Sequence, residues 1–205
     1  FILVGPSRDR IIFFSRGAEK QITINNLNLE ILKKAKWAYI TALSGEWRNN
    51  LKKIFSVKGL KVAWNPGNAQ IKAGFKGIGN FLKKTEIFIV NKDEALELAV
   101  SDKKYKNREK KFLNDTSNLL KIIYSYGPKT VVVTDGKNGA YVYDGKRFYF
   151  QPIIKEKRRA DTTGVGDAFG SSFVAGLELY KGDIKKSMRL GARNSASVIA
   201  EVGAQ

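Results

Sequence analysis

The apolar residues of the chain fall into short continuous runs that are separated by longer segments of helical spacing. Four runs rich in β-branched and aromatic residues predict buried strands, at residues 37–40, 61–64, 87–90 and 130–134. Helical spacing is found between and after these runs, at residues 27–34, 47–57, 78–83, 94–100, 113–124, 168–180 and 184–201. Strands that alternate with helices predict an α/β protein with a mostly parallel sheet.

Two pairs of strand-like runs are joined by turn residues. The first pair, residues 1–4 and 10–15, surrounds a turn that contains Gly5 and Pro6. The second pair, residues 140–143 and 147–150, surrounds Asp144 and Gly145. This turn chemistry predicts a β-hairpin at each place. The lysine-rich residues 101–111 are expected to form a loop.

Polar and glycine residues follow the predicted parallel strands. In such sheets, ligands bind at the loops that follow the carboxyl ends of the strands. The loops in question are residues 41–45, 65–68, 91–94, 134–139 and 161–167. They gather asparagine, threonine, glycine and acidic side chains on one edge of the sheet, which suits a site for phosphates and a cation.

Composition narrows the possible chemistry. The 205 residues include no cysteine and no histidine, which excludes a Ser-His-Asp triad and the usual zinc sites. A general base must therefore be Asp, Glu, Lys or Tyr. Lysine and arginine number 37 against 19 acidic residues, a net charge of +18. Because most lysines are scattered in pairs, we interpret them as solvated faces and do not expect nucleic-acid binding.

The chain has no apolar run long enough to span a membrane, and the run at residues 1–4 lacks the length and the cleavage pattern expected of a signal peptide. A cytoplasmic enzyme or binding protein is therefore expected. The sequence opens on a strand-like run without a methionine, so we expect it to be part of a longer protein.

The stretch from Asp161 to Gly170 is the densest group of functional residue types. Gly164 and Gly166 allow a backbone to bend or to approach a ligand closely. The helix that follows begins with unpaired N–H groups, which suit a phosphate, and Asp167 could take a proton from a hydroxyl. The simpler interpretation is an ordinary loop-to-helix joint with Thr163 or Asp161 as the cap.

Taken together, the motifs resemble those of the PfkB, or ribokinase-like, family of ATP-dependent sugar and nucleoside kinases. The carboxyl-terminal signature of that family is similar to residues 161–170, and its Asn-x-x-Glu motif is similar to residues 91–94. Further similar stretches are the nucleotide loop at 134–140, the closing helix at 194–205 and a loop at 65–67. The resemblance implies a three-layer αβα fold with a mostly parallel sheet and part of a small β lid. Residues 1–17 would be the lid hairpin, and residues 18–205 the core with the ATP site.

The resemblance also implies roles for individual residues. Asp167 would be the base, and Gly164, Val165 and Gly166 would form an anion hole for the transferred phosphoryl group. Asn91 and Glu94 would hold the triphosphate and Mg²⁺, Glu94 through water. The nucleotide would be bordered by Thr134, Gly136 and Gly139, with Asn194 near the adenine. Asp161 and Thr163, with carbonyls near Gly203, could bind K⁺.

Several assignments keep a plain structural alternative. Asn91 and Glu94 could equally be a helix cap and an acid in the first turn of the helix. Gly136 and Gly139 also read as turn glycines, and Asn194 as an ordinary polar residue within a helix. The sequence lacks a Walker A motif and the protein-kinase motifs.

The sequence does not include the amino-terminal third that the resemblance leads us to expect, with its Gly-Gly-Asn-like substrate motif. We expect the chain to be the carboxyl-terminal two-thirds of a kinase domain. A sheet edge left open by the missing strands would invite a partner, and a homodimer is one possibility. The favoured function is a carbohydrate kinase. The alternatives are a nucleoside kinase of the same fold and a catalytically silent basic binding protein.

Overall fold

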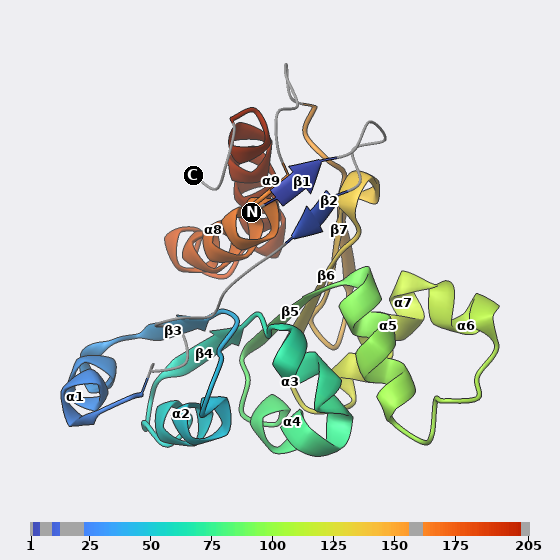
Figure 1. Cartoon of the computed structure of the whole chain (residues 1–205). Coiled ribbons are helices and arrows are strands. Elements are labelled where there is room, and N and C mark those ends of the chain that lie inside the picture. The colour runs from blue at the N-terminus through green and yellow to red at the C-terminus, as the bar shows by residue number, and fades with distance from the viewer. Residues whose placement is uncertain (1, 5–9, 13–22, 156–161, 202–205) are drawn as a thin grey trace.

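In the part of the chain that the structure describes, six strands form the main sheet (Figure 1). The computed structural model describes residues 2–4, 10–12, 23–155 and 162–201, with side chains from residue 23 onward. In spatial order the strands are β3 (Trp37–Ile40), β4 (Lys61–Trp64), β5 (Ile87–Asn91), β6 (Thr130–Thr134), β7 (Ala140–Tyr143) and β8 (Phe148–Gln151). The first four are parallel to one another, and β7 and β8 are antiparallel. The prediction of a mostly parallel sheet is confirmed.

Helices cover both faces of this sheet (Figure 1). One face packs against α8 (Val165–Leu179) and α9 (Ile184–Ile199). Buried residues on the opposite face belong to one cluster with residues of α2 (Trp47–Ile54), α3 (Asn68–Lys72), α4 (Gly74–Leu82), α5 (Lys92–Ser101), α6 (Lys110–Asn114) and α7 (Thr116–Tyr124). Leu32 of α1 (Asn26–Lys34) packs against the same cluster. The architecture is therefore the three-layer αβα fold that the motifs implied.

The central strand β6 shows why an unbroken apolar run forms here. Val132 belongs to the cluster beneath α8 and α9, whereas Val131 and Val133 belong to the cluster on the other face. All three side chains are fully buried. A parallel strand covered on both faces needs apolar residues at every position, so β-branched residues without polar alternation mark the middle of the sheet.

The first predicted hairpin is present as a separate two-stranded sheet. Its strands β1 (Ile2–Val4) and β2 (Arg10–Ile12) pair antiparallel, with Leu3 opposite Ile11. Residues 13–17 of the predicted lid lie outside the described residues. The role of this hairpin as a lid stays a prediction.

Several predicted helix boundaries are wrong. The prediction at 78–83 missed α3 and began α4 four residues late, because Gly74, Gly77 and Gly79 obscure the helical spacing. The helix predicted at 113–124 is two helices, since Asp115 accepts a hydrogen bond from the Ser117 N–H and caps α7. Part of the predicted loop at 101–111 also belongs to α6. Within the described residues, no helix has the length and apolar character needed to cross a membrane.

Candidate active site

The carboxyl ends of β5 and β6 bring two of the predicted residues side by side. Asn91 is the last residue of β5 and lies opposite Thr134, the last residue of β6, in the parallel register. Asn91 is also the N-cap of α5. The polar ends of two adjacent strands therefore meet at one edge of the sheet, as the sequence predicted.

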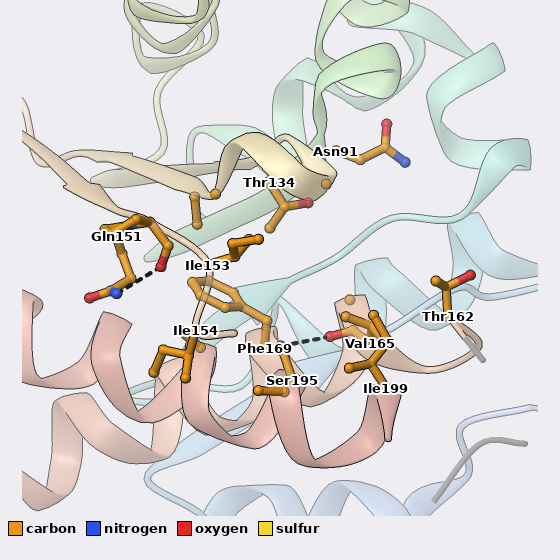
Figure 2. A pocket seen from close by; sticks show the side chains of 17 residues that line it. Asn91, Thr134, Gln151, Ile153, Ile154, Thr162, Val165, Phe169, Ser195 and Ile199 are labelled. Atoms are coloured by element: carbon orange, nitrogen blue, oxygen red, sulfur yellow. Dashed lines mark hydrogen bonds between the residues drawn. The ribbon is translucent and has the colours of Figure 1, made fainter. Parts of the chain in front are cut away.

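A pocket of about 360 Å³ lies beside these strand ends (Figure 2). Its lining includes six of the predicted site residues: Asn91, Thr134, Gly136, Gly139, Val165 and Gly166. Its other walls come from the segment after β8 and from α8 and α9. Small-molecule sites have volumes of roughly 300–1,000 Å³, so the pocket has the size of a ligand site.

One side of the pocket is apolar. Ile153 and Ile154 line this side together with Phe169 of α8 and Ile199 of α9 (Figure 2). Ile153 remains 44% exposed, and a large apolar side chain left open in this way is suited to contact with the flat face of a ring. None of these four residues was predicted for the site. The sequence offered one sign of this apolar wall, the pair Ile153 and Ile154 after the second hairpin. This pair follows neither the strand period nor the helix period.

The amino terminus of α8 begins at this pocket. Gly164 is the N-cap, with φ of 79°, and as a glycine it has no side chain with which to cap the helix. The carbonyl of Gly164 accepts a hydrogen bond from the Ala168 N–H at 2.8 Å. The N–H groups of the first turn have no acceptor within the helix, and the helix dipole favours negative charge there. This start of α8 can therefore bind an anion.

Asp167 lies in the first turn of α8, where its side chain is exposed. Its negative charge contributes to the raised pKa of two neighbouring groups, Tyr39 and Glu94. Burial raises the pKa of Tyr39 to about 12, with the charge of Asp167 adding to the shift. Burial also raises the pKa of Glu94, and Asp167 is the smallest of the charges that add to that shift. The carboxylate of Asp167 thus shares one end of the sheet with β3 and with the start of α5.

Asn91 and Glu94 form a reciprocal capping box at the start of α5. The Asn91 side chain accepts a hydrogen bond from the Glu94 N–H at 2.9 Å, and the Glu94 carboxylate accepts one from the Asn91 N–H at 2.9 Å. The simple cap interpretation of this motif is therefore correct in its geometry. It does not exclude a ligand, because Asn91 also lines the pocket.

An ion pair joins the two strand-end loops. Lys92 follows Asn91, and Asp135 follows Thr134; the Lys92 Nζ lies 2.9 Å from Asp135 Oδ2. The two side chains are 33% and 17% exposed, so solvent screens this pair less than it screens a surface pair. It fixes the start of α5 against the turn at Gly136–Asn138. Sequence reasoning did not single out either residue.

The remaining predicted residues lie around the pocket or outside the described residues. Asn194 is not among the residues that line it; its amide donates to Ser172 Oγ at 2.9 Å and lies 3.5 Å from the Ala168 carbonyl. The neighbouring Ser195 lines the pocket instead and donates to the Val165 carbonyl at 3.1 Å. Thr163 lies beside Gly164, half-buried. Asp161 and Gly203, predicted to help bind K⁺, lie outside the described residues.

Comparison with known proteins identifies the family. The pfkB family carbohydrate kinase model matches residues 1–205, and the chain belongs to this family. Among curated proteins, a cytidine kinase of Thermococcus kodakarensis is 30% identical over 123 residues, which cover 60% of this chain and 40% of the relative. An uncharacterized sugar kinase of Archaeoglobus fulgidus is 26% identical over 209 residues, which cover 100% of this chain and 77% of the relative.

Solved structures agree on the fold. A ribokinase from Thermotoga maritima matches with a TM-score of 0.76 at 19% identity, covering 100% of this chain and 63% of that one. A nucleoside kinase from Methanocaldococcus jannaschii matches with a TM-score of 0.74 at 22% identity, covering 100% and 62%. The chain therefore spans less than two thirds of the length of these structures, and the ribokinase-like fold is shown for that part.

Proposed function

We propose that the protein transfers the γ-phosphoryl group of ATP to a hydroxyl group of a sugar or sugar derivative. The observation that carries this proposal is the position of the start of α8, which has a glycine as its N-cap and contains Asp167 in its first turn. It opens on the same pocket that Asn91, Thr134 and Gly139 line. An anion site, a carboxylate and a pocket of the size of a ligand site at one sheet edge are parts that phosphoryl transfer requires.

The pocket suits a nucleotide on chemical grounds. The apolar side formed by Ile153, Phe169 and Ile199 can cover a base, while the first-turn N–H groups of α8 can bind phosphate oxygens. Thr134 and the glycines of the following loop contribute a hydroxyl and exposed backbone between these two regions. Asn194 as an adenine contact stays a prediction.

Glu94 is the residue best suited to a metal. Its carboxylate is half-buried and burial raises its pKa, so a nearby cation would stabilise the charged form. Among the described residues there is no cluster of three or more acidic side chains that could hold a metal directly. This fits a Mg²⁺ ion carried mainly by phosphate oxygens and reached from Glu94 through water. Bound Mg²⁺ would neutralise charge on the phosphates.

The proposed step needs one base. Asp167 accepts the proton of the substrate hydroxyl, and the hydroxyl oxygen forms a bond to the γ-phosphorus. The bond between that phosphorus and the bridging oxygen of ADP breaks, and ADP leaves. N–H groups of Gly164, Val165 and Gly166 stabilise the charge on the transferred group.

The substrate that accepts the phosphoryl group has two candidates, a sugar and a nucleoside. The similarity to a cytidine kinase supports a nucleoside as the second candidate. Radiolabelled ATP with a panel of ribose, fructose, 2-keto-3-deoxygluconate, adenosine and cytidine would separate the two. A labelled sugar phosphate as product supports the first candidate, and a labelled nucleoside monophosphate supports the second. No transfer to any acceptor, together with no binding of Mg·ATP, would refute both and favour a basic binding protein.

Asp161 and Thr163 are proposed to bind K⁺, which predicts faster turnover in K⁺ than in tetramethylammonium.

A homodimer is proposed, and sedimentation equilibrium would test it. A cytoplasmic location is proposed, and cell fractionation would test it.

A further inference from the structure

Tyr39 has a buried hydroxyl group that the fold does not explain. It lies on β3 and packs against the cluster beneath α8 and α9. Its hydroxyl oxygen is buried and, among the described residues, has no hydrogen-bond partner. Leaving a buried hydroxyl unpaired is unfavourable, and an unpaired group of this kind calls for a reason.

The surroundings of the hydroxyl place it on the face of α8 that carries Asp167. A Cβ atom built on Gly170 would overlap the Tyr39 hydroxyl and would lie 3.2 Å from Tyr39 Cζ. The hydroxyl therefore occupies the space of a side chain at position 170. Positions 167 and 170 are three residues apart on one helix face, where Cβ atoms are about 5–6 Å apart. The hydroxyl of Tyr39 thus contacts α8 at position 170, on the helix face that also carries Asp167.

The electrostatics of Tyr39 agree with this arrangement. Burial raises the pKa of Tyr39 to about 12, and the charge of Asp167 adds to the shift. The phenol therefore stays protonated at physiological pH and remains a hydrogen-bond donor. A neutral donor beside a carboxylate favours the ionised form of that carboxylate.

We propose that Tyr39 is a positioning residue for Asp167. Its hydroxyl donates a hydrogen bond to one carboxylate oxygen in the substrate complex and leaves the other oxygen to accept the proton of the substrate hydroxyl. Gly170 is required because any side chain there would displace the phenol. This inference rests on the proposed function, since it assigns a helper to the base of that reaction.

The test is Tyr39→Phe, which removes the hydroxyl and keeps the ring. Tyr126→Phe is the control, because the Tyr126 hydroxyl is also buried but lies next to a different acid, Asp102, which helps to raise the pKa of that phenol. A hydrogen bond to a charged group is worth about 10-fold or more in rate. We expect Tyr39→Phe to lose that factor in kcat, with an unchanged KM for ATP. Tyr126→Phe should keep the wild-type kcat.

Two readouts separate positioning from a purely structural role. The first is the melting temperature: Tyr39→Phe should unfold at the same or a higher temperature than wild type, because it removes an unpaired buried hydroxyl. The second is the pH dependence of kcat: the acidic side of the profile should move to higher pH in Tyr39→Phe. Gly170→Ala should lower kcat by displacing the hydroxyl, and adding it to Tyr39→Phe should cause little further loss.

Equal kcat for wild type and Tyr39→Phe would overturn the inference while leaving the proposed function intact. Equal losses in Tyr39→Phe and Tyr126→Phe would also overturn it. If wild type itself transfers no phosphoryl group to any acceptor, the proposed function fails and this inference fails with it.

Discussion

Two glycines of one loop, Gly136 and Gly139, should respond very differently to the same substitution. Both have positive φ, at 48° and 92°. A Cβ on Gly136 would meet no atom within 4 Å, whereas a Cβ on Gly139 would overlap the Gln151 carbonyl oxygen and lie 3.1 Å from Pro152 Cα. The ψ of Gly139 is −155°, which places it in a region that only glycine adopts readily.

These geometries set the size of the effect. A left-handed alanine costs about 1–2 kcal/mol, and that is the whole expected effect of Gly136→Ala. Gly139→Ala carries about 1–3 kcal/mol of backbone strain and about 1–3 kcal/mol of overpacking against a backbone that cannot rotate away. The expected destabilisation by Gly139→Ala is therefore about 2–6 kcal/mol.

Urea unfolding of the two variants measures this difference directly, and the nucleotide KM gives a second readout. Because Gln151 and Pro152 line the pocket, Gly139→Ala should also raise the KM for ATP more than Gly136→Ala does. If both variants unfold at the same urea concentration and share one KM, the close contact between Gly139 and the end of β8 is wrong.

Three further predictions concern the same site. Gly166→Ala should raise the melting temperature slightly, because alanine is favoured over glycine in a helix by about 0.5–1 kcal/mol. Its methyl group meets no protein atom within 4 Å and should lower kcat by occupying the pocket. Glu94→Gln should be more stable than wild type in metal-free buffer as pH rises, and should need more Mg²⁺ for half-maximal activity. The folded-state pKa of Glu94 is raised. The favourable contribution of Glu94 to the free energy of unfolding of wild type is therefore present below about pH 4.3 and is lost as pH rises through the raised pKa. Lys92→Met and Asp135→Asn should each raise the KM for ATP, and the double variant should lose less than the sum of the two; additive losses would argue against the ion pair.

The parts of the site that the sequence predicted depend on local features. Asn91 follows an apolar run and precedes an acid three residues later, so its place at a strand end and helix start can be read from neighbouring residues. Gly164 and Gly166 come before the apolar run at residues 168–180, which predicted a helix after them; α8 begins three residues earlier, at Val165, so Gly166 lies in its first turn. Strand β6 was predicted with the correct ends because three successive valines permit few alternatives.

The parts that the sequence did not predict depend on packing between distant segments. Which face of α9 meets the pocket is set by Gly191, whose missing Cβ lets the helix approach the Phe169 carbonyl oxygen. This contact turns Ala192, Ser195 and Ile199 toward the pocket, while the Asn194 amide reaches Ser172 on α8. Helical spacing identifies α9 but not this rotation. For the same reason, nothing near Tyr39 in the sequence indicates that it reaches the helix of Asp167.

The activity of Asp167→Asn tests the central claim most directly. The side chain of Asp167 is exposed, so this isosteric change should leave folding intact. Asp93→Asn, an exposed acid in the first turn of α5, is the matched control. A general base contributes about 10²–10⁴-fold to the rate. We therefore predict that Asp167→Asn loses at least about 100-fold in kcat, while its KM for ATP and the activity of Asp93→Asn stay near wild type. Wild-type kcat in Asp167→Asn would contradict the account.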